Sequence, residues 1–260
     1  MTYDQNSPLF VIRDQNTGDG PLDTATSRAV LRAVSAHDMP ETFEVGLSSR
    51  VLAFGKHDTS SPGFARSVEV ADEHGFEPTV RIAGGRAAVF HETTIRFGWT
   101  RLVEDPASTM HEGFRALSGV VVDTLGDFGI HAEIGEIPGE YCPGQYSVHI
   151  GNKKVMGVGQ RLTRNAAHVG GVIVLSNSEV INEVLIPIYE LLDIPMAPEA
   201  TGSVADAFEV DAALFMDRFT EHIVAGRAST LESMPETVRA AALGFRTDHD
   251  PRELHDGSQP

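Results

Sequence analysis

The chain has 260 residues, with 37 Asp and Glu against 20 Lys and Arg, so its formal net charge is -17 at pH 7. A chain of this length is expected to form one large domain with a sizeable core. The acidic balance excludes nucleic-acid binding, because phosphate contacts need clustered Lys and Arg, and the short apolar runs exclude a membrane span, which needs about 18 such residues. The first residues lack the pattern of a signal peptide, so we expect a cytoplasmic protein.

The first half of the chain predicts helices and strands that follow a loose N-terminal segment, residues 1–20. The first helix is expected to be capped by Asp23 or Thr24, because a side-chain oxygen there would accept a hydrogen bond from a free backbone N–H. The predicted elements, in chain order, are a helix over 25–34, a strand over 48–58, a helix over 62–75 and strands over 78–83, 86–91 and 95–102.

The second half predicts a block of strands between helices, and a polar C-terminal tail, residues 246–260, that is expected to fray. Strand blocks that alternate with groups of helices favour an α+β fold, with mixed or antiparallel sheets flanked by helices, in a single domain over 21–245. The predicted elements are a helix over 107–129, strands over 145–150, 153–162 and 166–175, and helices over 178–193, 206–225 and 233–243.

Lysine is almost absent, since only Lys56, Lys153 and Lys154 occur among the 20 basic residues. Many carboxylates with scarce lysine predict a halophilic protein, because at molar salt the Debye length falls to about 3 Å and a large net charge is tolerated. An ordinary acidic cytosolic protein is the alternative. The single cysteine, Cys142, excludes an internal disulfide and favours a reducing compartment.

Residues 81–91 form the first candidate segment, with Gly84 and Gly85 between two strand patterns. Glycines permit φ > 0 and a close approach of the backbone to a ligand, and their N–H groups can bind a carbonyl or a phosphate. From the residues alone, a plain hairpin is the favoured interpretation.

Residues 141–161 form the second candidate segment, with Lys153 and Lys154 side by side and Cys142 just upstream. A solvated surface pair is the ordinary interpretation of two lysines. In a chain that otherwise avoids lysine, retention of two lysines favours a role that needs a compact ammonium. Cys142 would ordinarily be a small buried hydrophobic residue, but Pro143 and Gly144 after it predict a turn that presents the thiol to a substrate.

The sequence does not indicate a metal site. His91-Glu92 begins like a zinc-protease helix, but Ile95 stands at the position of the second histidine and its neighbours predict a strand. His149 is not an evident general base. His168 is flanked by Ala and Val on a predicted strand, which favours a structural role.

These two segments resemble the lipoate-protein ligase and octanoyltransferase family, which implies the biotin and lipoate ligase type of catalytic domain. In that family an Arg-containing strand leads into a glycine-rich loop and a V-F-H segment, and a downstream G-[RK]-K segment carries an essential lysine. Ala83 stands where the ligases have Ser, and Arg86 replaces their third glycine. The matching positions are Arg81, Gly84, Gly85, Val89, Phe90, His91, Gly151, Lys154, Gly157, Gln160 and Arg161.

The Y-C-P-G-x-Y run before the lysines is most similar to the amidotransferase branch of the family. That resemblance implies transfer of an octanoyl or lipoyl group from the glycine-cleavage H protein to the lipoyl domains of 2-oxoacid dehydrogenases, without a cofactor. It makes Cys142 the nucleophile and Lys154 a catalytic residue that lowers the thiol pKa and stabilises the oxyanion. The substrate-binding residues that it implies are Arg81, Gly84, Gly85, His91, Gly157 and Gln160.

Two other functions stay open at this point. An ATP-dependent lipoate-protein ligase would use ATP and Mg²⁺ to form an acyl-adenylate, with Lys154 on the phosphate and Cys142 in a packing role, and this type of enzyme usually needs an accessory domain. A non-catalytic binder of acylated carrier domains is the second. A biotin ligase is disfavoured, because Gly85-Arg86-Ala87-Ala88 stops short of the G-R-G-R loop.

One geometric difficulty concerns Cys142 and Lys154. If Gly151-Asn152 closes a two-residue hairpin, Lys154 pairs with His149, and an extended strand would place Cys142 about 23 Å further along. The chain must therefore bend near Pro143-Gly144 for the two side chains to meet. Their proximity is implied by the resemblance alone.

Overall fold

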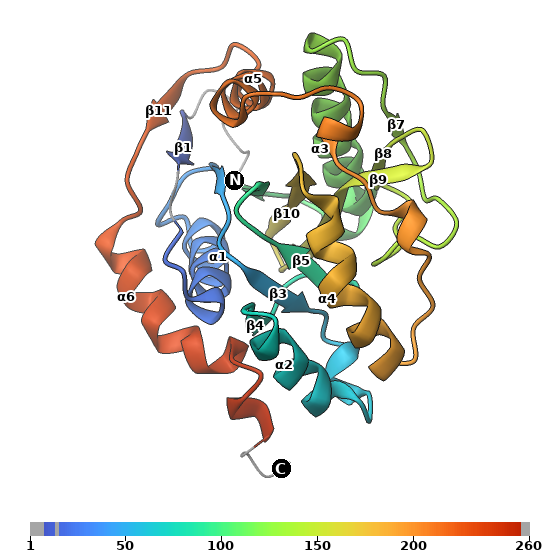
Figure 1. Ribbon diagram of the computed structural model, residues 1–260. Coiled ribbons are helices and arrows are strands. Elements are labelled where there is room, and N and C mark those ends of the chain that lie inside the picture. The colour runs from blue at the N-terminus through green and yellow to red at the C-terminus, as the bar shows by residue number, and fades with distance from the viewer. Residues whose placement is uncertain (1–7, 14–15, 256–260) are drawn as a thin grey trace.

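The computed structural model describes residues 8–13 and 16–255 (Figure 1). It has an eight-stranded sheet in the order β11-β1-β2-β6-β10-β9-β8-β7 and a three-stranded sheet in the order β4-β3-β5. The strands are β1 Leu9–Arg13, β2 Thr42–Leu47, β3 Val51–Phe54, β4 Glu77–Val80, β5 Ala88–Phe90, β6 Thr94–Leu102, β7 Glu133–Ile134, β8 Val148–Ile150, β9 Lys153–Leu162, β10 Ala166–Val174 and β11 Ser229–Leu231. The helices are α1 Gly20–Ser35, α2 Phe64–Glu73, α3 Pro106–Asp127, α4 Ser178–Leu191, α5 Ala212–Val224 and α6 Glu236–Phe245.

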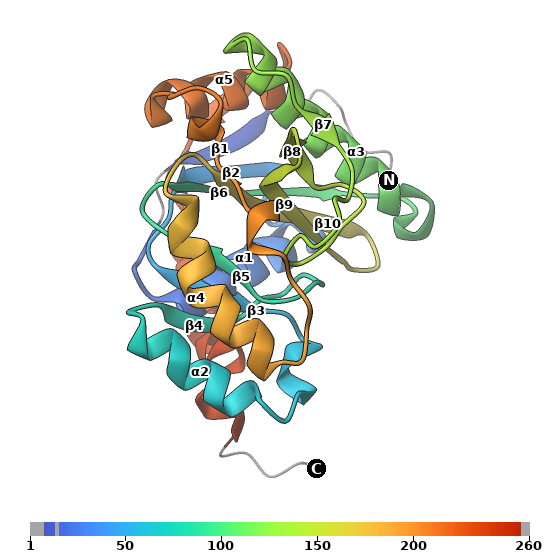
Figure 2. The same cartoon turned by 45° about the vertical axis from the view of Figure 1, so that its right-hand side comes forward.

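Helices cover both sheets, as Figures 1 and 2 show. α3 and α5 lie over one face of the large sheet, where Phe43, Phe97 and Phe219 pack edge to face. α2 and α4 lie side by side over the small sheet and share a second apolar cluster with it. α1 lies between the sheets and packs against α6 in a third cluster. The mixed sheets flanked by helices confirm the predicted α+β class.

The predicted loose N-terminal segment is wrong for residues 9–13. Leu9, Val11 and Ile12 are buried, and β1 pairs in parallel with both β2 and β11 inside the large sheet. Residues 1–7 and 14–15 of the predicted segment lie outside the described residues. The first helix also begins earlier than predicted, because Asp19, and not Asp23 or Thr24, accepts the hydrogen bond from the Leu22 amide.

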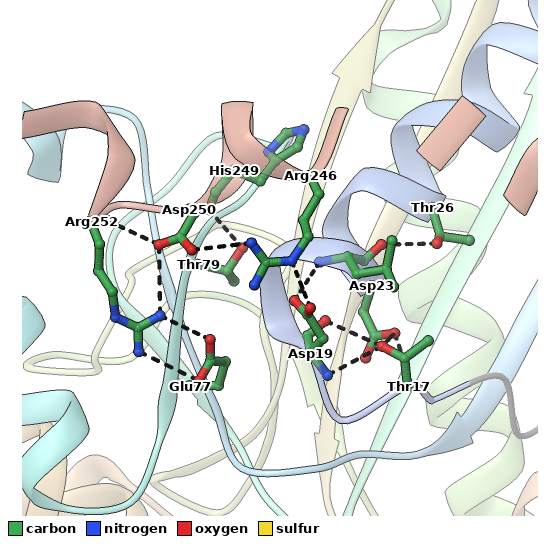
Figure 3. A network of polar contacts seen from close by, with 11 residues as sticks. Thr17, Asp19, Asp23, Thr26, Glu77, Thr79, Arg246, His249, Asp250 and Arg252 are labelled. Carbon is green, nitrogen blue, oxygen red and sulfur yellow. Dashed lines mark hydrogen bonds and ion pairs between the residues drawn. The ribbon is translucent and has the colours of Figure 1, made fainter. Parts of the chain in front are cut away.

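The C-terminal segment is also ordered where a frayed tail is predicted, over residues 246–255. The segment forms two short 3-10 helices, Arg246–His249 and Glu253–His255, and the first lies against α1 and β4 (Figure 3). The Arg246 guanidinium pairs with Asp19 at 2.6 Å, and Arg252 pairs with Glu77 at 2.9 Å. The buried His249 donates through Nδ1 to the Val80 carbonyl at 2.7 Å. Residues 256–260 lie outside the described part of the chain.

Deletion of residues 246–260 should therefore lower the melting temperature by about 5 °C, since each kcal/mol lost shifts the Tm of a domain of this size by about 2–4 °C. The deletion removes the ion pairs of Arg246 with Asp19 and of Arg252 with Glu77, and it leaves the Val80 carbonyl without its His249 donor. Differential scanning fluorimetry at molar KCl measures the shift. Deletion of residues 256–260 alone is the control, and an equal melting temperature for both truncated chains would contradict a stabilising role of this network.

Candidate active site

Cys142 lies in the loop before β8, in a backbone conformation that is rare for any residue except glycine, with φ 43°. Its amide donates to the Tyr189 hydroxyl at 2.7 Å, and that hydroxyl donates to the Ala87 carbonyl at 2.9 Å. Tyr189 is fully buried in α4 and ties the cysteine loop to β5. A left-handed conformation outside glycine costs free energy and persists only where surrounding contacts hold it, as these do.

Two donors surround the Cys142 thiol. Arg81 Nη2 lies 3.1 Å from Sγ, and the backbone amide of Arg86 lies 3.2 Å from it. Burial raises the pKa of Cys142, but the positive charges of Arg81 and Lys154, with the Arg86 amide, outweigh burial and hold the pKa below that of an ordinary thiol. This site therefore favours the thiolate, which is the nucleophilic form of cysteine.

The glycine loop that supports these donors is not a hairpin, so the plain hairpin interpretation is wrong. β4 and β5 both pair with β3 and lie on opposite sides of it, so residues 81–87 cross over the end of β3. The backbone passes very close to β3, since a methyl group added at Gly55 would lie 1.8 Å from the Gly85 carbonyl oxygen. Gly85 has φ 106°, and a methyl group there would lie 2.8 Å from Cys142 Sγ. Only glycine leaves room for the thiol at this position.

Lys154 lies on β9 opposite His149, as the hairpin register predicts. Its side chain is buried, and Nζ donates to the Cys142 carbonyl at 2.8 Å and to the Tyr141 carbonyl at 2.9 Å. The third contact is with Glu140 Oε1 at 3.4 Å. The chain therefore bends as required, because β8 begins only at Val148 and the residues before it turn back toward β9.

Lys154 binds the backbone carbonyl groups of Cys142 and of the residue before it, Tyr141. All three N–H groups of an ammonium are accounted for by these contacts. Burial lowers the pKa of Lys154, and the nearby Cys142 and Glu140 charges oppose that effect. Gly157 leaves space for this side chain, since a methyl group there would lie 3.3 Å from Lys154 Cε.

Glu140 and Tyr189 are functional candidates that the sequence did not reveal. Glu140 is buried and accepts hydrogen bonds from the Gly144 amide and the Ser147 hydroxyl, both at 2.8 Å. It thereby closes the loop that carries Cys142. The position of Glu140 just before the Y-C-P-G run was the one sequence signal for its role in the loop. Tyr189 lies far from that run in the sequence, and no sequence signal pointed to it.

A cavity of about 130 Å³ begins at Arg81 and runs between α1 and the large sheet. Both apolar side chains, among them Val51 and Phe90, and polar side chains, among them Glu44 and Arg96, line it. His168 also lines the cavity, and burial lowers its pKa to about 4. Its Nδ1 lies 2.8 Å from the Thr100 hydroxyl, and the structural role expected for His168 stays a prediction.

Of the six predicted substrate-binding residues, Arg81 alone lines the cavity. His91 is buried after β5, with Nδ1 3.3 Å from the Thr93 hydroxyl. Gln160 points toward α3, because a methyl group on Gly113 would lie 3.0 Å from its Nε2. Neither residue lines the cavity, whereas Arg81 does. Gly84 and Gly85 lie in the exposed loop beside Cys142.

Within residues 8–13 and 16–255, no group of three or more His, Cys, Asp or Glu side chains is arranged to hold a metal ion. In the same part of the chain, no helix has the length and apolar character that crossing a bilayer requires.

Comparison with known proteins places this geometry in a family. The model of the lipoyl protein ligase A/B catalytic domain matches residues 20–224. The chain belongs to this family. Its fold agrees as well, since a crystal structure of lipoate-protein ligase A bound with ATP superimposes with a TM-score of 0.73 over 92% of this chain and 93% of that chain, at 16% identity. The family and fold implied by the two sequence segments are thus confirmed.

Curated relatives match a shorter part of the chain. An octanoyl-[GcvH]:protein N-octanoyltransferase of Geobacillus kaustophilus is 26% identical over 151 residues, which are 58% of this chain and 53% of that protein. A lipoyl-[GcvH]:protein N-lipoyltransferase of Listeria monocytogenes is 25% identical over 137 residues, which are 53% of this chain and 49% of that protein. The matched region thus spans about half the length of these family members.

Proposed function

We propose that the protein transfers an octanoyl or lipoyl group through a thioester on Cys142 to a lysine of a carrier domain. The observation that carries this proposal is the Cys142 thiol, which accepts hydrogen bonds from Arg81 and the Arg86 amide beside the cavity that Arg81 lines. The names of the transferases of Geobacillus and Listeria support the same chemistry.

The reaction takes place in two acyl transfers. In the first, the Cys142 thiolate attacks the carbonyl carbon of an acyl-lysine amide, the new C–S bond forms, and the C–N bond breaks as the departing lysine takes up a proton from solvent. In the second, the neutral amine of the acceptor lysine attacks the thioester, the C–S bond breaks, and the amine proton is lost to solvent. Arg81 and the Arg86 amide donate to the thiol, and in this proposal they also donate to the oxyanion that forms on the carbon bonded to sulfur in each transfer.

The donor in this proposal is the glycine-cleavage H protein, and the acceptors are the lipoyl domains of 2-oxoacid dehydrogenases. The acyl chain occupies the cavity, where burial of methylene groups at about 0.8 kcal/mol each contributes to binding. No cofactor takes part, because the amide itself carries the acyl group. A cytoplasmic location remains a prediction from the sequence.

Intact mass spectrometry tests the proposal. The protein at molar KCl is mixed with octanoylated or lipoylated H protein without ATP and then treated with hydroxylamine. A hydroxylamine-labile acyl adduct that is absent in Cys142→Ala supports the thioester. Failure to form an adduct, together with lipoylation of a carrier and pyrophosphate release only when free lipoate, ATP and Mg²⁺ are added, would assign the ligase function instead. Carrier binding without turnover in either assay would indicate a non-catalytic binder.

Transfer should become faster as KCl rises from dilute buffer toward molar concentration. With 37 acidic and 20 basic residues, the protein repels acidic carrier domains at low ionic strength, and salt screens this repulsion. Initial rates at a series of KCl concentrations measure the effect. The carrier concentration is kept far below KM, so that the rate depends on the association of the protein with the carrier. A maximum rate in dilute buffer would contradict both this expectation and the halophilic interpretation.

A further inference from the structure

A row of glycines crosses the large sheet beneath the cavity. Gly159 on β9 pairs with Gly170 on β10, which pairs with Gly98 on β6. Residues paired in this way point to the same face of a sheet. The row begins beside the glycine loop, since a methyl group on Gly159 would lie 3.3 Å from the Gly84 carbonyl oxygen.

Glu44 on β2 continues the same row, because it pairs with Gly98. Its side chain turns back over the row, and a methyl group on Gly98 would lie 3.5 Å from Glu44 Oε2 and 2.8 Å from the His168 ring. Glu44 is 3% exposed and lines the cavity, and Oε2 has no hydrogen-bond partner among the described residues. The row of glycines thus leads from the glycine loop, where Arg81 and Gly85 contact the thiol, to a buried carboxyl oxygen that lacks a partner among the described residues.

The spacing suits an acyl chain of eight carbons. Neighbouring strands lie about 4.8 Å apart, so Gly98 is roughly 9.5 Å from Gly159. An extended chain of eight carbons spans about 9 Å, given C–C bonds of about 1.5 Å. Arg81, which contacts Cys142 Sγ at 3.1 Å, and Glu44 line the same cavity, so an acyl chain carried by Cys142 enters the cavity in which Glu44 lies.

We infer that Glu44 determines acyl specificity and that the cavity is built for a chain with a sulfur-containing end, lipoyl, in preference to the methyl end of octanoyl. This inference rests on the proposed function. A methyl group would leave the buried carboxyl without a partner, and sites built to hydrogen-bond a substrate reject analogues that lack the bonding group. Dithiolane sulfur accepts a hydrogen bond weakly and is polarisable.

The protonation of Glu44 agrees with a donor role. Burial raises the pKa of Glu44 to about 7, although the positive Arg96 opposes the rise and the negative Asp23 adds to it. These groups and His168 face the carboxyl from β6, α1 and β10. Near neutral pH a large part of Glu44 is therefore the protonated acid, which can donate to sulfur.

The experiment compares loading of Cys142 from H protein that carries either octanoyl or oxidised lipoyl. In single-turnover reactions, we expect the unmodified protein to load lipoyl about tenfold faster. Glu44→Leu should remove or invert this ratio, and Glu44→Gln, which retains a donor, should keep it. The lipoyl to octanoyl ratio should also fall as pH rises through about 7 in the unmodified protein and stay constant in Glu44→Gln.

Glu41→Gln is the matched control, because Glu41 is also a buried carboxylate but pairs with Arg227 and Trp99. It should leave the ratio unchanged. Thermal melting shows which variants are folded. If Glu44→Leu does not fold, the pH dependence of the ratio in the unmodified protein and in Glu44→Gln still tests the inference. If Cys142 is loaded but lipoyl and octanoyl load equally fast, the inference is overturned. The same holds if Glu44→Leu leaves the lipoyl to octanoyl ratio unchanged. No loading of Cys142 from either donor would overturn the proposed function instead.

Discussion

Cys142→Ser should lower acyl transfer by about 10³-fold or more, because loss of a catalytic nucleophile removes the covalent route altogether. A serine hydroxyl keeps almost the same volume but has a far higher pKa than a thiol. The Arg81 guanidinium, which lies 3.1 Å from the thiol, is not sufficient to ionise a serine hydroxyl at this position. The measurement is single-turnover transfer from acylated H protein to a lipoyl domain, followed by mass spectrometry of the acceptor.

Cys142→Ala provides the comparison that separates chemistry from folding. Both variants retain the backbone contact between the Cys142 amide and Tyr189, so their melting temperatures should stay within a few degrees of the unmodified protein. Full transfer activity in the serine variant would show that the thiol is incidental and that the acyl group is activated in another way.

The parts of the fold that the sequence predicted are those with strong local patterns. The hairpin of β8 and β9, with Gly151 in its turn and Lys154 paired with His149, follows from alternation and a glycine turn. β2 was missed, because the buried Glu44 and Thr42 interrupt its apolar pattern. β1 and β11 were missed as well, since short strands are recognised only through partners that are distant in sequence.

The site, like the fold, was predicted only where the sequence carries a local signal. Cys142 and Lys154 stood out by their rarity in the composition, and the structure brings them together. Arg81 was expected to bind substrate, but its contact with the thiol joins residues 61 positions apart, which no local pattern reveals. Gln160 belongs to the matching motif yet points to the opposite face of the sheet from Gly159, because side chains alternate along a strand.

Arg81→Gln should shift the acid limb of the pH profile of transfer to higher pH. It should lower the transfer rate at neutral pH by roughly 10- to 100-fold. The Arg81 charge helps to hold the pKa of Cys142 below its ordinary value. Without this charge the pKa rises, so a smaller fraction of the thiol is ionised at any pH below it, and one pKa unit corresponds to about 1.4 kcal/mol. Activity should recover partly at alkaline pH, where the thiolate forms without help.

The rate of Cys142 alkylation by iodoacetamide across a pH series reads the thiol pKa without a carrier protein. Arg81→Lys should show a smaller shift than Arg81→Gln, because an ammonium keeps the charge but lacks the planar guanidinium fork. Arg86→Gln is the matched control, since Arg86 contacts the thiol through its backbone amide while its side chain pairs with Asp58. If Arg86→Gln moved the alkylation profile as far as Arg81→Gln, general positive charge in the loop would set the thiol pKa, and the direct contact with Arg81 would not.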